Sequence, residues 1–228
     1  VLFKTKKEEK TIEVKDFKLL TKALLPLPEK WHGLEDEEER LRRRYLDLIM
    51  NPNQHELFIK KSKFWQATRE FLMKEGGIEV ETPILEQIPG GADAEPFITH
   101  MNALDTDFYL RISPELNLKR LIVGGFDKVF EIGRIFRNEG IDREHLQDYT
   151  QMEMYWAYYN YEKLMEFIER LFKHIIMETL GTSSHQFQNK IVNWNFLWNR
   201  YDYYREFEKY TGLKLQEAGE KDLINYAK

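Results

Sequence analysis

The stretch FEIGRIFRNEG, residues 130–140, decides the fold of this chain. Apolar side chains alternate along it as they do in a strand that buries one face, and they are Phe130, Ile132 and Phe136. The same stretch contains four charged residues before it ends at Gly140: Glu131, Arg134, Arg137 and Glu139. The pattern predicts a half-buried strand whose charges are organised to hold a polyanionic ligand.

The charged residue types near this strand suit a ligand that carries phosphates and amines together. Arg134 and Arg137 offer fork-shaped donors for phosphate or carboxylate, on the same sheet face as the acids. The acids Glu115, Glu139 and Glu153 offer acceptors for amines or a metal. A nucleotide with an amino acid has this mixture of groups. The alternative is a set of surface ion pairs, which stabilise a protein only weakly, and the residue types alone leave both open.

The flanking sequence predicts a mixture of helices and strands. Residues 128–140 and 149–161 are two strand-like runs, and the polar segment between them predicts an antiparallel hairpin with a long loop. Further strands are expected at residues 11–20, 78–85 and 107–113. Helices are expected at residues 35–50, 54–75, 114–125, 161–180 and 196–210. The glycine loop at residues 88–97 can approach a ligand closely.

Composition limits the class of protein. A chain of 228 residues with 42% apolar residues can bury a large core, and its lack of cysteine excludes disulfides and suits the reducing cytoplasm. No apolar run approaches the roughly 20 residues of a membrane span, and no signal-peptide core is present at the start. The net charge of -5 argues against a generally basic nucleic-acid binder. The local basic run ERLRRRYLD, residues 39–47, is interpreted as a solvated helix face.

Several stretches carry a resemblance to a known family. FWQATREFLMKEGGIEVETPIL, residues 64–85, is similar to motif 1 of class II aminoacyl-tRNA synthetases, a long helix and a strand that ends at a fixed proline, here Pro83. Residues 130–158 are similar to motif 2 of the same class. The segments LLPLPEKWHGL, RRRYLDLIMNP and IPGGADAEPFITHMNALDTDFYLRISPELNLKRLIVGG resemble lysyl-tRNA synthetases specifically. The resemblance covers nearly the whole chain.

The resemblance implies an α+β fold of the class II aminoacyl-tRNA synthetase type, an antiparallel sheet flanked by helices, incomplete and preceded by a remnant of an OB-fold. Residues 1–25 would form the C-terminal end of the OB-fold anticodon-binding domain, residues 26–53 a linker, and residues 54–228 the N-terminal part of the catalytic domain. Motif 3 and the Mg²⁺ ligands are expected beyond residue 228, and no metal ligands within the chain. Motif 1 implies a homodimer.

The resemblance also implies which residues bind ATP. Arg137 matches the arginine that bridges the substrate carboxylate and the α-phosphate, and it is expected to be catalytic by orienting both and stabilising charge. Glu139 matches the acid near the adenine amino group, and His145 matches the loop histidine near the phosphates. Tyr149 matches the aromatic residue that stacks on adenine.

The implied lysine-binding residues surround two carboxylates. They are Gly91, Ala92, Glu115, Arg137, Glu153 and Tyr155. Glu115 would accept from the α-ammonium, at a position where aspartyl and asparaginyl relatives usually have glutamine, while Glu153 and Tyr155 belong to the side-chain pocket. Two desolvated carboxylates suit two ammonium groups and reject an uncharged competitor.

The implied function is lysine–tRNA ligase, in which lysine and ATP form lysyl-adenylate and the lysyl group passes to tRNA(Lys). Because the resemblance stops before motif 3, the chain by itself is expected not to be competent. The alternatives are a catalytically silent lysine- and ATP-binding or dimerisation module, and a tRNA-independent lysyl transferase. One departure concerns the motif 2 loop, where the family commonly has an arginine at the position of Glu144; Arg143 is the candidate to replace it.

Overall fold

The computed structural model describes residues 2–27, 34, 36–142 and 144–227. The chain forms two compact units, Val1–Phe58 and Ile59–Lys228. The expected linker at residues 26–53 falls within the first unit, and its residues 28–33 and 35 lie outside the described residues.

The first unit contains a short hairpin and two short helices. Strands β1 (Leu2–Lys4) and β2 (Lys10–Ile12) pair antiparallel, so the strand expected at residues 11–20 is far shorter than predicted. Helices α1 (Glu37–Arg42) and α2 (Arg44–Met50) replace the single helix predicted for residues 35–50. The prediction of one helix is wrong because Arg43 has φ −114° and ψ 51°, which is not helical.

The basic run of the first unit is largely neutralised by acids. Asp47 is fully buried and accepts from Arg40 Nε at 2.8 Å, and it also pairs with Arg44. The hydrogen bond from Arg40 lowers the pKa of Asp47. Arg42 and Arg43 form ion pairs with glutamates one turn earlier in α1. Arg42 and Arg43 are exposed, as predicted for a solvated helix face, but Asp47 is buried and the run is divided between α1 and α2.

The second unit carries most of the helices and strands. Helix α3 (Gln54–Lys74) leads into it and ends close to the predicted residue 75. The elements that follow are β3 (Ile78–Glu79), β4 (Leu85–Glu86), β5 (Ile98–Met101), β6 (Thr106–Leu110), α4 (Glu115–Val123), β7 (Lys128–Phe136), β8 (Asp148–Trp156), α5 (Tyr161–Leu180), β9 (Ser184–Phe187), β10 (Lys190–Asn193), α6 (Tyr203–Thr211) and α7 (Glu220–Ala227).

The strands of the second unit form two three-stranded sheets and a hairpin. The predicted hairpin is confirmed: β7 and β8 pair antiparallel from Lys128↔Trp156 to Phe136↔Asp148. Strand β3 pairs with β7 in parallel over two residues. The second sheet has the antiparallel order β4-β6-β5, and β9 pairs antiparallel with β10. The α+β class with mainly antiparallel pairing is therefore confirmed, with one short parallel pair.

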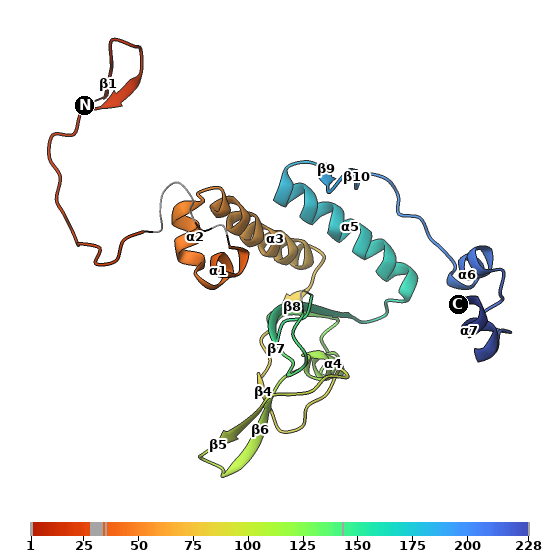
Figure 1. Cartoon of the computed structure of the whole chain (residues 1–228). Coiled ribbons are helices and arrows are strands. Elements are labelled where there is room, and N and C mark those ends of the chain that lie inside the picture. Colours follow the sequence, from red (N-terminus) through yellow and green to blue (C-terminus); the bar gives the residue numbers. More distant parts are fainter. Residues whose placement is uncertain (1, 28–33, 35, 143, 228) are drawn as a thin grey trace. The chain divides into compact units, whose positions relative to one another are not determined.

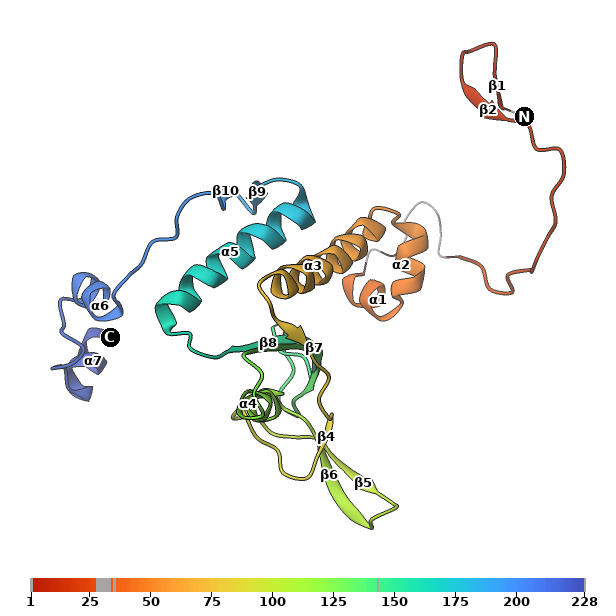
Figure 2. The same ribbon diagram turned by 180° about the vertical axis from the view of Figure 1, so that it is seen from behind.

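The main core lies between α3, α5 and one face of the β7–β8 hairpin. Figure 1 shows the two helices side by side next to the hairpin, and Figure 2 shows the same arrangement from behind. The rings of Phe71 in α3 and Phe167 in α5 meet edge to face at 5.4 Å, and Phe130 of β7 is fully buried in the same cluster. One face of the hairpin is therefore packed against the core.

Helix ends follow the capping residues in the sequence. Asn160 accepts from the N–H of Lys163 and Gly181 ends α5 with φ 69°, so the predicted helix at residues 161–180 is confirmed. Asp202 caps α6 in the same way, and the predicted start at residue 196 is wrong because this cap sets the start at Tyr203. Among the described residues, no helix has the length and apolar character needed to cross a membrane.

Candidate active site

The face of the hairpin that turns away from α3 and α5 contacts α4 and carries alternating polar side chains. The register places side chains in directly opposed pairs on this face: Glu131 with Glu153, Gly133 with Gln151, and Ile135 with Tyr149. Opposed residues of an antiparallel pair point to the same face of the sheet, and every second residue along each strand points to that face as well. The sequence thereby gathers acids, an amide and an aromatic ring on one surface.

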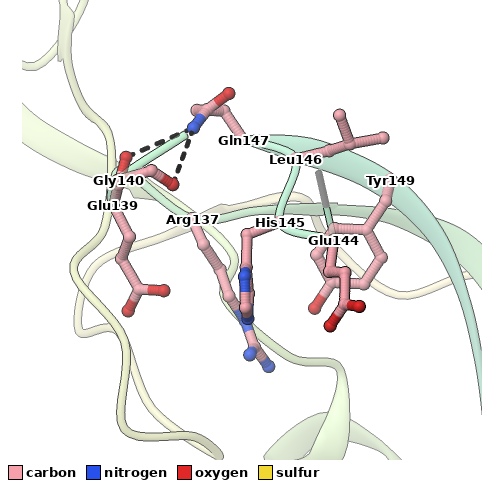
Figure 3. Close-up of a pocket in the computed structure, with 8 residues that line it drawn as sticks. All are labelled: Arg137, Glu139, Gly140, Glu144, His145, Leu146, Gln147 and Tyr149. Atoms are coloured by element: carbon pink, nitrogen blue, oxygen red, sulfur yellow. Dashed lines mark hydrogen bonds between the residues drawn. The ribbon is translucent and has the colours of Figure 1, made fainter. Parts of the chain in front are cut away.

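At one end of this face, the strand ends and their loop enclose a pocket of about 320 Å³ (Figure 3). Its lining residues are Arg137, Glu139, Gly140, Glu144, His145, Leu146, Gln147 and Tyr149. All four residues that the sequence analysis expected to bind ATP are among them. In Figure 3 the side chains of Arg137, Glu139 and His145 extend toward the same side of the pocket.

Arg137 follows the last residue of β7 and has spare donors. Its Nη2 makes one long hydrogen bond, 3.5 Å to the carbonyl oxygen of Ile112, and its Nε is buried without a hydrogen-bond partner among the described residues. Its guanidinium carbon lies 5.8 Å from the centre of the Tyr149 ring. A guanidinium held over a ring with unused donors is suited to bind an oxyanion.

The loop of the pocket is organised by Asp142. Its Oδ1 accepts from the N–H groups of Glu144 and His145 at 2.7 and 2.8 Å, and its Oδ2 lies 2.6 Å from Nδ1 of His145. These bonds, first the one from the Glu144 N–H, lower the pKa of Asp142. Glu144 lines the pocket, so a carboxylate occupies the place expected for an arginine, and Arg143 lies outside the described residues.

Glu139 and Tyr149 lie at the edges of the same pocket. Glu139 is exposed, and its Oε1 accepts a long hydrogen bond of 3.4 Å from the N–H of Glu95. The loop is closed by Gln147, whose Nε2 donates to the carbonyl oxygens of Glu139 and Gly140 at 3.2 and 3.4 Å (Figure 3). The Glu139 carboxylate therefore remains available to accept from an amine.

Farther along the same face, Glu153 is the centre of a hydrogen-bond network. Its Oε1 accepts from Ser113 Oγ at 2.8 Å and from Gln151 Nε2 at 2.5 Å, and its Oε2 accepts from the Tyr155 hydroxyl at 3.2 Å. Burial raises the pKa of Tyr155, and the charges of Glu153 and Glu115 raise it further, so the phenol keeps its proton and donates. The network fixes a carboxylate at one rotamer.

Glu115 approaches the same place from the first turn of α4. Its N–H donates to Ser113 Oγ at 3.1 Å, and its carboxylate pairs with Lys119 at 2.6 Å. The backbone of Gly91 packs closely against this turn. A Cβ added at Gly91, whose φ is +86°, would lie only 2.9 Å from the Cβ of Glu115. The structure thus brings Gly91, Glu115, Glu153 and Tyr155 together around Ser113, whereas Ala92 is exposed in the adjoining bend.

Comparison with known proteins gives this geometry a family. The model of the family tRNA synthetases class II (D, K and N) matches residues 36–225. The chain belongs to this class II tRNA synthetase family. It is similar to the lysine–tRNA ligase of Carboxydothermus hydrogenoformans, with 49% identity over 228 residues, and to that of Bacillus subtilis, with 47% identity over 228 residues. The match to the Thiobacillus denitrificans lysine–tRNA ligase is 53% over 191 residues, 84% of this chain.

The matches cover most or all of this chain but less than half of each relative. The matches to the Carboxydothermus hydrogenoformans and Bacillus subtilis ligases cover the whole of this chain but only 46% of the length of each relative. The match to the Thiobacillus denitrificans ligase covers 38% of that relative. This class II synthetase chain therefore corresponds to less than half of the lysine–tRNA ligases that it matches.

Sequence reasoning misplaced one residue of this class II synthetase site. Arg134 was expected beside Arg137, but the register puts it on the opposite face, where it pairs with Asp148 and donates to Thr150 at 3.4 Å. The placement is wrong because residues 134 and 137 differ by an odd number, and strand side chains alternate with period two.

Sequence reasoning also missed three residues that the site contains: Arg111, Ser113 and Gln151. Gln151 is signalled by the same alternation that gives Tyr149, Glu153 and Tyr155. Ser113 lies between β6 and α4, 40 residues before its partner Glu153, and no local pattern relates the two. Tertiary contacts of this kind are not visible in periodicity.

The described residues of this class II synthetase chain offer no group of three histidine, aspartate or glutamate side chains placed to hold a metal ion. Magnesium use is general for the family, but the described residues do not fit a metal centre.

Proposed function

We propose that this chain is the lysine- and ATP-binding part of a lysine–tRNA ligase. One observation carries the proposal: a fixed carboxylate, Glu153, and a second one, Glu115, converge around Ser113 on the sheet face whose other end forms the pocket beside Arg137. The relatives with 47 to 53% identity bear the same name, lysine–tRNA ligase.

The amino acid would lie between these two ends of the face. Glu115 would accept from its α-ammonium, displacing Lys119, and Glu153 with the Tyr155 hydroxyl would accept and orient the side-chain ammonium. The half-buried carboxylate of Glu153 already accepts from several donors, so it does not need to reorganise when a cation binds. An uncharged side chain would leave it unpaired, which disfavours competing amino acids.

ATP would occupy the loop pocket next to the amino acid. Tyr149 would stack on adenine, Glu139 would accept from its amino group, and His145 would lie near the phosphates. Arg137 would bind both the lysine carboxylate and the α-phosphate, so that the carboxylate oxygen attacks phosphorus in line with the departing pyrophosphate. Its role is orientation and charge stabilisation, without a protein nucleophile.

Further parts of the proposal extend beyond the described site. The lysyl group of the adenylate would pass to tRNA(Lys), with Mg²⁺ held by residues outside this chain. The cytoplasm fits a protein without cysteine. Residues 1–25 would be the end of an OB-fold. Helix α3 exposes the apolar side chains Ile59, Phe64 and Met73, which supports a homodimer through the motif 1 region up to Pro83.

Substituting the two acids tests the proposal. Glu153→Gln and Glu115→Gln should each weaken lysine binding by roughly 2 to 5 kcal/mol if the pairs are desolvated, with ATP binding nearly unchanged. Titration calorimetry of the chain with lysine and with ATP measures both affinities. Glu153 should show the larger loss, because Glu115 already shares its charge with Lys119.

Glu206→Gln is the matched control for this experiment. Glu206 lies on α6 and pairs with Lys209, and it lines none of the site described above. Equal weakening of lysine and ATP binding in the two site variants, or lysine affinities equal to that of the control, would return the acids to a structural role.

A further inference from the structure

A buried ion pair lies on the site face, next to the residues proposed to bind lysine. Arg111 and Glu131 are 2% and 3% exposed, and Arg111 Nη1 lies 2.5 Å from Glu131 Oε1. Thr82 completes the group: its hydroxyl donates to Glu131 Oε2 at 2.7 Å, and its N–H donates to the same oxygen at 3.2 Å. Arg111 Nη1 also donates to the carbonyl and hydroxyl oxygens of Thr82, both at 3.2 Å.

This group joins three segments that are distant in sequence. Thr82 follows β3, Arg111 follows β6, and Glu131 lies in β7. Arg111 is bonded to β7 at two further points: its Nε donates to the carbonyl oxygen of Arg134 at 3.0 Å, and its own carbonyl accepts from the N–H of Phe136 at 3.1 Å. The side chain and backbone of Arg111 therefore join these three segments.

Gly133 provides the space for the guanidinium. A Cβ at this position would overlap Arg111 Nη2 and would lie 3.0 Å from Glu131 Oε1. Gly133 is not among the glycines with positive φ, so its backbone conformation does not require glycine. The absence of a side chain serves the close approach of Arg111.

The group is adjacent to residues at both ends of the proposed site. Glu131 lies directly opposite Glu153 in the β7–β8 ladder. Two opposed carboxylates repel each other, and the guanidinium of Arg111 offsets the charge of Glu131. On the other side, Phe136, which donates to the Arg111 carbonyl, immediately precedes Arg137.

We propose that Arg111 is a positioning residue: seated against Gly133 and held by Glu131 and Thr82, it fixes Glu153 and Arg137 at the separation that a bound lysine requires. The inference rests on the proposed function. Arg111 is then a buried cation that binds no ligand itself. It neutralises Glu131, so Glu153 is the member of the opposed carboxylate pair whose charge is left for lysine.

Gly133→Ala tests this role because it displaces the guanidinium while every charged group remains. Lysine binding should weaken roughly tenfold to a hundredfold, the loss typical of a misplaced site group. Binding of adenosine, which has no phosphate to contact Arg137 and relies on Glu139 and Tyr149, should stay at the control value. In the ligand-free chain, the amides of Thr82 and Phe136, which are bonded to Glu131 and Arg111, should exchange hydrogen faster.

Gly219→Ala is the matched control, because its Cβ would make only an ordinary 3.6 Å contact with Asp222. If circular dichroism shows that Gly133→Ala does not fold, Arg111→Lys replaces it, since lysine keeps the charge and lacks Nη2. The same lysine loss is expected.

The outcomes separate this inference from the proposed function. An unaltered chain that binds no lysine contradicts the proposed function itself. An unaltered chain that binds lysine, with Gly133→Ala binding it as tightly as Gly219→Ala, overturns only the positioning role. Equal losses for lysine and adenosine also overturn it, because they indicate general loosening of the fold.

Discussion

The two halves of the site differ in how their side chains are held. On the side proposed to bind lysine, Glu153 lies on a strand and accepts hydrogen bonds from Ser113, Gln151 and Tyr155. On the side proposed to bind ATP, Glu139 and His145 lie on an exposed loop whose order depends mainly on bonds between near neighbours in sequence. The strand-borne half is preorganised by tertiary contacts, whereas the loop-borne half is ordered mainly by local bonds, with one long tertiary hydrogen bond from the Glu95 N–H to Glu139.

This difference has a consequence for binding. A ligand group that enters the strand-borne half meets acceptors already at their rotamers, so little conformational entropy is lost on binding. A ligand in the loop-borne half must also immobilise exposed side chains, at about 0.5–1.5 kcal/mol for each one. Lysine specificity is therefore expected to depend on rigid contacts, and ATP affinity on stacking and charge.

The largest expected effect separates binding by both halves from reaction. The 228-residue chain should bind ligands but should not catalyse lysine-dependent exchange of pyrophosphate into ATP, because its described residues offer no group of acidic or histidine side chains placed to hold a metal ion. Loss of a metal ion that stabilises developing charge typically lowers a rate by roughly three or more orders of magnitude. The assay compares the chain with the full-length Bacillus subtilis relative.

Lysine binding by the same sample is the control, since it shows that the chain is folded. A rate comparable to that of the relative would mean that the two halves are sufficient for the chemistry. Binding without exchange is also what the alternative of a catalytically silent module predicts. A chain extended to the length of its relatives then distinguishes the two, because only a ligase part gains activity.

The strand-borne half was largely predictable from sequence, since alternation gives the faces of β7 and β8 once the hairpin is recognised. The same rule places Gln151 in the site and removes Arg134 from it. The contributions of Arg111 and Ser113 were not predictable, because they depend on where the end of β6 meets the hairpin. Local patterns specify elements, and contacts between distant elements specify a site.

An intermediate effect is expected at the ring of the loop-borne half. Tyr149→Leu should weaken ATP binding by roughly 1 to 3 kcal/mol, the contribution of one aromatic stack on a base. Tyr149→Phe should bind ATP nearly as tightly as the unaltered chain, because it keeps the ring next to Arg137. Fluorescence or calorimetric titration with ATP measures both.

Lysine affinity measured on the same variants sharpens the comparison between the halves. It should not change in Tyr149→Leu, because Glu153 draws its partners from Ser113, Gln151 and Tyr155 and not from the loop. A parallel loss of lysine affinity would show that the two halves are coupled and would break the comparison.

The smallest expected effect concerns the pH at which the loop loses its order. The N–H of Glu144 and then His145 lower the pKa of Asp142 from its ordinary value of 3.8. A lowered folded-state pKa means that the carboxylate orders the loop at pH values above 3.8, and that this order is lost as the pH falls through the folded-state value. Amide resonances of Glu144 and His145, followed by NMR during acid titration, should move with a midpoint below 3.8.

Two substitutions at the same position separate charge from geometry. In Asp142→Asn the amide oxygen still accepts from both backbone N–H groups, so the resonances should keep their positions and lose the titration. In Asp142→Ala the acceptor is gone, and both amides should resemble those of an unstructured loop at every pH. Circular dichroism at each pH verifies that the rest of the chain stays folded. If the resonances in Asp142→Ala match those of the unaltered chain, the loop is ordered by something other than Asp142, and the contrast between a locally ordered half and a tertiary-ordered half fails.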